Sequence, residues 1–353
     1  MIGYLCKYTP IELFYGFGET PQLIDPLPMD SQNADLHPNL CSFAKSACTH
    51  CVQNNVSQIV FTSCCDSIKR IYDVLGTSVS FESMLSLPRV HTPESVRLYA
   101  DGLMQFIQKF GDYADRKFDV ESFKQAVLAA SSAKQPEDQP HIAVLGARMP
   151  AGLLQSAQDC CTLPILDNTC TGQTRVFGAM PKTNDLQALM EWYAGELLSQ
   201  PPCMRMQDVS QRSDYSSNTH LKGIIYHTIK FCDYYGFEYA ALKKSSSLPV
   251  LKLESDYADA GSGQFRTRIE AFFESLGILS EPAPASTPTY IKQTVSQKYF
   301  AGIDSGSTST DAVLLDGDLN ILGYSILPTG GRSVDGAQAA LKDLLAKCGI
   351  QYE

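Results

Sequence analysis

The segment SQIVFTSCCDSIKRIYDVLG, residues 57–76, decides the fold class of this chain. Residues 59–61 form a short apolar run of β-branched and aromatic side chains, which is typical of a buried strand. Apolar residues then recur at i, i+3, i+4 and i+7, the spacing of one helix face, at Ile68, Ile71, Tyr72 and Leu75. The pattern therefore predicts a strand that runs into a helix at Cys64 and Cys65.

The same alternation of strand and helix recurs further along the chain. Extended segments are expected within residues 141–154, in LPILDN, and from residues 223 and 248 onward. Helical patterns lie between or after them, at 186–198, 234–244 and 265–277. Residues 92–134 are expected to form a helical connector, which Thr92 and Pro93 would begin. Because strands that alternate with helices form parallel sheets, we predict an α/β fold with two doubly wound lobes.

Composition shifts along the chain predict where its domains end. Residues 280–298 are rich in Pro, Ala, Ser and Thr and lack apolar periodicity, which is typical of a linker. We expect a first α/β lobe with the helical connector at 1–135, a second α/β lobe at 136–279, and a partial third domain at 299–353. The third domain contains a predicted β-hairpin, one more strand and one helix. This is too little sheet to bury both faces, so we expect a truncated domain.

Charge and hydropathy argue against nucleic acid and membrane partners. The 353 residues carry 28 Lys and Arg against 38 Asp and Glu, for a net charge of -10, and no basic cluster stands out. No apolar run approaches the roughly 18 to 20 residues that a membrane helix needs. The N-terminus lacks a basic region followed by an apolar core, so we expect a cytoplasmic protein.

The twelve cysteines are the unusual feature of the composition. A disulfide framework is typical of small secreted domains, so metal or redox chemistry is favoured in a chain of this length. Six cysteines end or flank predicted strands or lie in nearby loops, which suits the thiolate ligands of an iron-sulfur centre: Cys41, Cys51, Cys65, Cys170, Cys203 and Cys232. Four others are expected to pack as small hydrophobic side chains: Cys6, Cys160, Cys161 and Cys348.

Other readings of the cysteines and their neighbours are open. The Cys-x-x-Cys at 48–51 is half of a zinc site without an obvious second half. Thioredoxin-type chemistry is less favoured there, because the motif does not open a helix after a strand. Thr62, Ser63, His227 and Thr228 flank the predicted cysteine cluster and either donate hydrogen bonds into it or satisfy strand ends.

The sequence resembles the 2-hydroxyacyl-CoA dehydratase family of the D-component type. The matching segments occur in family order over most of residues 1–277, namely TPIELFYGFGETP, HPNLCSFAKS, IVFTSCCDSIKRIYD, DNTCTG, IKFCDYYGFEYAALK and LPVLKLESDYADAGSGQFRTRIEAFFE. The resemblance implies two Rossmann-like lobes and a cleft in which three cysteines hold a 4Fe-4S cluster. The cysteines that match those ligands are Cys41, Cys65 and Cys232.

The double-cubane cluster branch of that family is still more similar. The branch implies an 8Fe-9S double cubane held by six cysteines of one chain, with Cys51, Cys170 and Cys203 as the three additional ligands. The stretch from Cys41 to Cys51 is shorter than the branch pattern. Cys48 is therefore an alternative to Cys51, and Cys64 is an alternative to Cys65.

The C-terminal segment FAGIDSGSTSTDAVLLD resembles the first phosphate-binding hairpin of the activator ATPase, a member of the actin-like superfamily. The resemblance implies that Asp304 orients Mg-bound water and that Gly306, Ser307 and Thr308 approach the phosphates of ATP. Asp311 stands where activators usually have Lys, and the rest of the nucleotide site is absent. We therefore expect ATP and Mg to act only through a complete activator domain.

These resemblances imply an enzyme that a complete ATP-dependent iron-sulfur activator supplies with low-potential electrons. The branch predicts an iron-sulfur reductase of a small-molecule substrate. One alternative is a dehydratase subunit with one 4Fe-4S cluster that removes water from a 2-hydroxyacyl-CoA through a ketyl radical. Another is a module that carries metal or electrons without catalysis. The family also suggests a homodimer and an anaerobic host, and no general acid or base is predicted.

Overall fold

The protein is described by a computed structural model, and the chain divides into two compact units, Met1–Glu281 and Pro282–Glu353. Each unit is considered by itself. The structure describes residues 2–26, 36–76, 78–132, 139–172, 175, 177–200, 203, 205–208, 218–256, 263–280, 299–306, 308–329 and 333–350.

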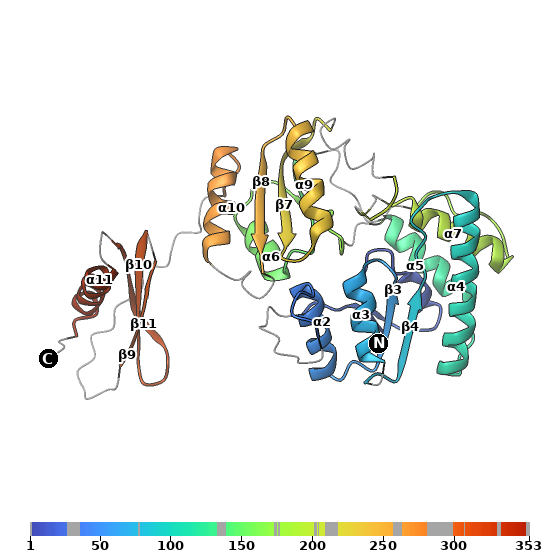
Figure 1. The fold of residues 1–353 in the computed structure, drawn as a ribbon, viewed down its shortest axis with the longest axis horizontal. Coiled ribbons are helices and arrows are strands. Elements are labelled where there is room, and N and C mark those ends of the chain that lie inside the picture. The colour runs from blue at the N-terminus through green and yellow to red at the C-terminus, as the bar shows by residue number, and fades with distance from the viewer. Residues whose placement is uncertain are drawn as a thin grey trace. The chain divides into compact units, whose positions relative to one another are not determined.

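The first unit contains two four-stranded parallel sheets (Figure 1). One sheet has the order β2-β1-β3-β4, with strands Ile2–Tyr4 (β1), Pro21–Leu23 (β2), Gln58–Thr62 (β3) and Phe81–Leu85 (β4). The other has the order β6-β5-β7-β8, with strands His141–Gly146 (β5), Ile165–Asp167 (β6), Leu221–Ile229 (β7) and Val250–Ser255 (β8). The prediction of parallel sheets is confirmed.

Helices cover both faces of each sheet in the first unit. The helices are Glu12–Tyr15 (α1), Ser42–Gln53 (α2), Asp66–Leu75 (α3), Pro93–Ala114 (α4), Val120–Ser132 (α5), Ala151–Asp159 (α6), Leu186–Leu198 (α7), Asp233–Ser245 (α9) and Gly263–Ser275 (α10). In the first sheet, the Phe61 ring lies 5.5 Å from that of Tyr72 on α3, and the Phe81 ring lies 5.1 Å from that of Phe110 on α4. Phe61 and Phe81 project to opposite faces, so both faces are buried, as parallel sheets require.

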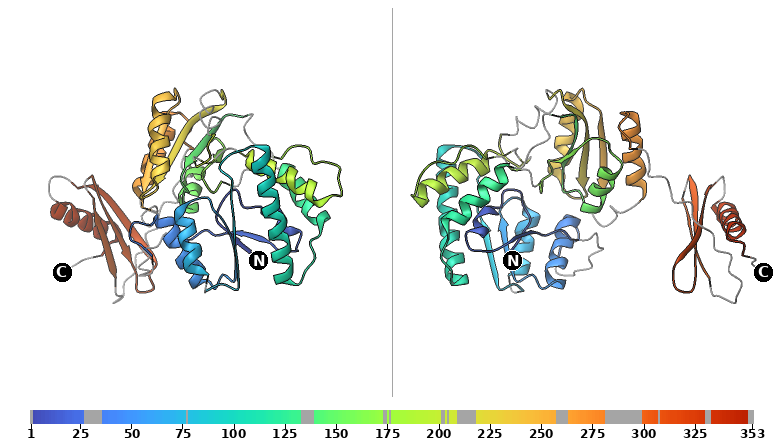
Figure 2. Two further views of the ribbon diagram at one scale, coloured as in Figure 1. Left: turned by 45° about the vertical axis from the view of Figure 1, so that its right-hand side comes forward. Right: turned by 180° about the vertical axis from the view of Figure 1, so that it is seen from behind.

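The second sheet is packed in the same way. Ile142, Val144 and Ile225 belong to a core with residues of α6 and α10, whereas Ala143 and Ile224 face the larger core of the unit. Successive residues of a strand point to opposite faces, so this division follows directly from the strand register. Figure 2 shows α10 and α9 on opposite sides of the sheet.

Both sheets have their topological switch point at equivalent strands. In each sheet the second strand lies on one side of the first, and the third strand lies on the other. In open α/β sheets, ligands bind beyond the carboxyl ends of the two strands at which the order reverses. Those strands are β1 and β3 in one sheet, and β5 and β7 in the other.

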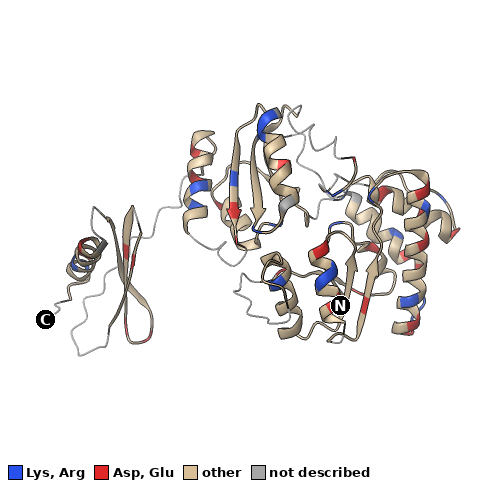
Figure 3. Ribbon diagram, in the orientation of Figure 1, with Lys and Arg blue, Asp and Glu red and all other residues tan. Residues whose placement is uncertain are grey.

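The predicted helical connector is confirmed as α4 and α5. Thr92 and Ser95 form a capping box, in which the Thr92 hydroxyl accepts a hydrogen bond from the Ser95 backbone N–H at 3.3 Å. Acidic and basic residues are mixed along α4 (Figure 3). No helix in the described ranges is long and apolar enough to cross a membrane. The predicted lobe boundary at residue 135 lies outside the described residues and stays a prediction.

The described residues of the second unit form a three-stranded antiparallel sheet and one helix. Its strands, in the order β11-β10-β9, are Phe300–Ser305 (β9), Ser309–Leu315 (β10) and Ile321–Pro328 (β11), and the helix is Ser333–Cys348 (α11). The predicted hairpin, third strand and helix are therefore confirmed. Four buried residues form its core, Ala312, Leu314, Ala340 and Leu344. Residues 281–298 of the predicted linker lie outside the described residues.

His227 of β7 is fully buried, and both nitrogens of its ring have hydrogen-bond partners at the ends of strands. Its Nδ1 donates to the Ala147 carbonyl at 3.2 Å, and its Nε2 accepts from the Ser255 hydroxyl at 2.8 Å. Burial lowers its pKa to about 4, so the folded protein holds the neutral ring. Of the two roles that the sequence left open for His227, the structure favours the satisfaction of strand ends.

We expect His227 to make the protein less stable in acid. The unfolded chain binds a proton near pH 6.5 and the folded chain only near pH 4, so this contribution is complete above pH 6.5 and is lost as the pH falls to 4. The loss is about 3 kcal/mol. Urea unfolding between pH 7 and pH 4 measures it. His227→Gln should flatten the dependence, whereas the exposed control His91→Gln should keep it; equal pH slopes in all three proteins would contradict the prediction.

Candidate functional site

A cavity opens at the carboxyl ends of the four switch-point strands. It is lined by Cys6, which follows β1, by Cys64 and Cys65, which follow β3, by Arg148, which follows β5, and by Cys232, which follows β7. Because both switch points contribute, residues that are far apart in the chain meet at one place. We call this space the thiol cavity.

Seven cysteines line the thiol cavity: Cys6, Cys41, Cys64, Cys65, Cys170, Cys203 and Cys232. Five of them are among the six that the sequence predicted as ligands. The sequence treated Cys6 as a packing residue and Cys64 only as an alternative to Cys65. The other expected packing residues, Cys160, Cys161 and Cys348, do pack against hydrophobic cores.

Three of the lining cysteines occupy the N-cap positions of helices. Cys41 is the N-cap of α2, Cys65 that of α3 and Cys232 that of α9. A helix N-terminus presents unpaired N–H groups and a partial positive charge, which stabilise thiolate and other anions nearby. Three such ends meet at this cavity, so its wall favours bound negative charge.

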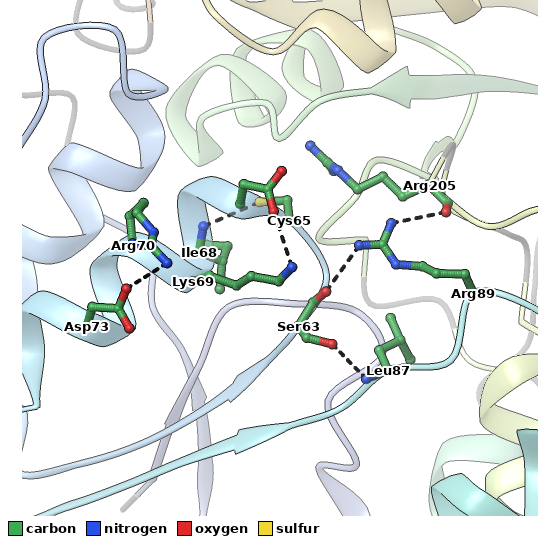
Figure 4. Close-up of polar contacts among 10 residues, drawn as sticks. Ser63, Cys65, Ile68, Lys69, Arg70, Asp73, Leu87, Arg89 and Arg205 are labelled. Carbon is green, nitrogen blue, oxygen red and sulfur yellow. Dashed lines mark hydrogen bonds and ion pairs between the residues drawn. The ribbon is translucent and has the colours of Figure 1, made fainter.

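Cys65 is the lining thiol that the structure activates most clearly. Its sulfur accepts a hydrogen bond from the Ile68 backbone N–H at 3.4 Å (Figure 4). The Cys64 thiol donates a second hydrogen bond to it, and the Arg205 guanidinium lies close by. These contacts lower the pKa of Cys65 to about 6 despite its burial. Cys65 is therefore available as a thiolate at neutral pH.

Cys41 and Cys232 are half-buried thiols whose charges affect one another. The pKa of Cys41 is raised to about 12, mainly by burial and to a smaller extent by the neighbouring Cys232 and Cys65. Burial also raises the pKa of Cys232, against the opposing charge of Arg205. As thiolates, these groups would need a positive partner in the cavity, which is what a metal centre provides.

Cys170 and Cys203 reach the cavity from loops that backbone contacts hold in place. The Cys170 backbone N–H donates to the Gly146 carbonyl at 3.1 Å, which ties this loop to the end of β5. The Cys203 backbone N–H donates to the Tyr8 hydroxyl at 2.9 Å, and its sulfur lies 3.1 Å from the Tyr235 hydroxyl. Both predicted cysteines therefore have fixed positions in the wall.

Cys51 is the predicted ligand that the structure does not bring to the thiol cavity. It lies in the last turn of α2, is 2% exposed, and belongs with Cys48 to the hydrophobic core. Burial raises its pKa to about 12. As a ligand, Cys51 stays a prediction that this geometry does not favour, and the same holds for Cys48.

Two arginines give the thiol cavity positive charge. The Arg148 guanidinium is paired with Asp25 and donates to the Thr171 hydroxyl at 3.0 Å. Arg205 instead has sulfur and aromatic partners: its Nη2 lies 3.9 Å from the Cys232 sulfur, and its Cζ lies 4.7 Å from the centre of the Tyr234 ring. The Arg205 Nε is buried and has no hydrogen-bond partner among the described residues.

Arg89 joins the loop that carries Cys65 to the loop that carries Arg205. Its guanidinium donates to the Ser63 carbonyl at 3.3 Å and to the Arg205 carbonyl at 3.2 Å (Figure 4). The Ser63 hydroxyl accepts from the Leu87 backbone N–H at 2.8 Å. Neither arginine was predicted from the sequence, because the contact that joins their two loops spans 116 positions.

The soft donor atoms in the described wall of the thiol cavity are thiols, and its other polar side chains are Ser67, Thr171, Arg148 and Arg205. No carboxylate or imidazole is among the described residues that line it. Within the described ranges, no three His, Cys, Asp or Glu side chains are arranged so that they could hold a metal ion as they stand. Thiolates without carboxylates or imidazoles are the ligands of iron-sulfur clusters and of other soft metal centres. By the chemistry of their donor atoms, the residues present therefore fit the cluster that the resemblance implies.

The predicted nucleotide-binding residues lie in the second unit. Asp304 lies in β9, and Gly306 and Thr308 lie in the turn to β10, all exposed. The Gly306 backbone N–H donates to the Ser309 carbonyl at 2.9 Å, which closes the turn. Ser307 lies outside the described residues.

Comparison with known proteins relates the first unit to one family. The family described as "2-hydroxyglutaryl-CoA dehydratase, D-component" matches residues 6–135 and 127–276. No curated protein matches the chain. The matched residues include every cysteine that lines the thiol cavity.

Proposed function

This chain belongs to the 2-hydroxyglutaryl-CoA dehydratase D-component family, and on that premise we propose that its first unit holds an iron-sulfur cluster in the thiol cavity. The ligands in this proposal are the thiolates of Cys41, Cys65, Cys170, Cys203 and Cys232. One observation carries it: three helix N-caps and two loop cysteines meet at one cavity that has no described carboxylate or imidazole.

We propose a cluster of the double-cubane type, 8Fe-9S. Cys41, Cys65 and Cys232 would suffice for the single 4Fe-4S cluster of the dehydratase type, with one iron left for another ligand. Cys170 and Cys203 line the same cavity as these three, which favours a larger centre. When bound, such a cluster supplies one-electron chemistry at low potential.

In this proposal, the chain itself positions the thiolate ligands, limits the access of water to the thiol cavity and offsets the negative charge of the thiolates. Leu5, Phe43 and Ile68 are buried apolar residues of the cavity wall, which keep the local dielectric low. The three helix ends and Arg205 lower the cost of thiolate charge there. The Arg89 guanidinium donates hydrogen bonds to the Ser63 and Arg205 carbonyls, and so joins the two loops that carry Cys65 and Cys203.

The proposed partner is a complete ATP-dependent iron-sulfur activator, from which the protein takes electrons for the reduction of a small molecule. Asp304, Gly306, Ser307 and Thr308 of the second unit would contact Mg and ATP only as part of such a complete domain. A homodimer is proposed from the family resemblance alone. The second candidate function is that of a 2-hydroxyacyl-CoA dehydratase component, which the family match favours.

Activity with a complete activator tests the two candidates. The anaerobically purified chain, the activator, ATP and a reductant are mixed with either acetylene or a 2-hydroxyacyl-CoA. We expect ATP-dependent consumption of acetylene and none of the thioester. Consumption of the thioester with loss of water would favour the dehydratase instead, and consumption of neither substrate by a protein with bound iron and sulfide would favour an electron carrier.

Removal of the Arg205 charge should make reduction of the cluster harder. Arg205 lies close to Cys65 and Cys232, and a cation stabilises the reduced, more negative state. For Arg205→Gln, we expect the reduced-to-oxidised ratio at a fixed potential to fall at least tenfold, equivalent to ~59 mV for one electron.

A redox titration followed by electron paramagnetic resonance measures this change. Arg205→Lys keeps the charge, so the midpoint potential of its cluster should stay close to that of the unchanged protein. Arg97→Gln removes an exposed charge on α4 and should leave the midpoint potential unchanged. An unchanged midpoint potential in Arg205→Gln with full iron content would contradict the proposed role.

A further inference from the structure

The wall of the thiol cavity holds a run of three adjacent sulfurs. The Cys64 thiol lies within hydrogen-bond reach of the sulfurs of both Cys6 and Cys65. All three residues line the cavity. Cys64 therefore lies beside a sulfur that the proposed function already assigns to the cluster, and it lines the same cavity.

We propose that Cys64 is a further thiolate ligand of the cluster, in addition to Cys65, and that Cys51 is not a ligand. This inference rests on the proposed function and deepens it. In forming the site, the Cys64 thiol releases its proton to solvent and its sulfur binds iron.

The neighbours of Cys64 distinguish it from Cys6. The Cys6 sulfur has two donors within the protein, namely the Cys64 thiol and the Tyr8 backbone N–H. Its residue is 6% exposed, so Cys6 is largely enclosed. Cys64 is more accessible, and its side-chain partners are the two sulfurs themselves. Iron in place of the Cys64 proton leaves the hydrogen bond from the Tyr8 backbone N–H to Cys6 intact.

The geometry of α2 argues against Cys51. Cys41 is the N-cap of this helix, and Cys51 lies ten positions further along it. At a rise of about 1.5 Å per residue, Cys51 lies about 15 Å down the axis from Cys41. Its side chain is also enclosed in the core beside Cys48. Cys51 would reach the thiol cavity only if α2 unwound, at the cost of that buried packing.

Iron and acid-labile sulfide in the full chain, purified anaerobically, test the inference. We expect Cys64→Ala to lose half or more of the iron of the unchanged protein, and Cys51→Ala and Cys6→Ala to keep nearly all of it. Full iron in Cys64→Ala, or loss of iron in Cys51→Ala with Cys64→Ala unaffected, would overturn the inference.

A conservative variant separates ligation from folding. Cys64→Ser offers an oxygen ligand, so we expect it to fold with an unchanged melting temperature and to change the electron paramagnetic resonance spectrum of the reduced cluster. Cys6→Ser should leave that spectrum unchanged. The same spectrum in Cys64→Ser and the unchanged protein would overturn the inference. Absence of iron and sulfide from the unchanged protein would instead overturn the proposed function, so the two failures are distinguishable.

Discussion

Cys65→Ala and Cys232→Ala should each lose most of the iron that the anaerobically purified chain binds. Both residues are N-caps in the thiol cavity, on α3 and α9, and each replacement removes a thiolate at a helix end where negative charge is stabilised. The other proposed ligands are not free to fill the gap, because the backbone N–H groups of Cys170 and Cys203 donate hydrogen bonds at 3.1 and 2.9 Å. A cluster with a missing ligand exposes iron to solvent and is lost on purification.

Iron and sulfide analysis against a matched cysteine variant measures this loss. Cys348→Ala is the control, because Cys348 ends α11 in the second unit and packs on its small core. We expect this control to keep its full iron content. The same iron content in all three variants would contradict the assignment of Cys65 and Cys232 as ligands.

The second large effect concerns stability. Glu12 of α1 and Arg175 form an ion pair at 2.9 Å, with side chains only 2% and 5% exposed. The Tyr193 hydroxyl also donates to Glu12, and the Arg175 Nη2 donates to the Lys7 carbonyl at 2.9 Å. This network fixes the chain immediately after Cys6, so it supports the wall of the thiol cavity.

We expect Arg175→Met to destabilise the first unit by about 3 to 5 kcal/mol, because the Glu12 carboxylate would stay buried without its cation. Urea unfolding of the holoprotein measures the change. Arg97→Met breaks an exposed pair on α4 and should cost about 1 kcal/mol or less. The double variant Arg175→Met with Glu12→Leu should recover part of the loss; a single variant as stable as the unchanged protein would contradict the prediction.

Local pattern was sufficient for much of the fold. The switch from β-rich residues to helical spacing in residues 57–76 predicted β3 and α3, because both elements are decided by neighbours in sequence. The same reasoning placed Cys65 at a helix N-terminus, where the structure has it as an N-cap. Strand β1 was missed because three residues are too few to show a period, and β4 because Glu82 and Ser83 interrupt its apolar pattern.

Some residues of the site could not be predicted from the sequence pattern, because long-range contacts bring them together. Cys6 follows the unpredicted β1, so nothing marked it as a neighbour of Cys64. Arg205 acquires its role only when its loop meets the ends of β3 and β7. Cys51 was selected by its resemblance to a family position, whereas its place inside α2 depends on how that helix packs.

The most direct test of the thiol cavity as an iron-sulfur site is a count of metal and acid-labile sulfide per chain in the anaerobically purified, unchanged protein. We predict about eight irons with a comparable amount of sulfide, whereas about four would favour the single-cluster dehydratase type. Zinc without sulfide, or no bound metal at all, would contradict the proposal that these thiols hold an iron-sulfur cluster.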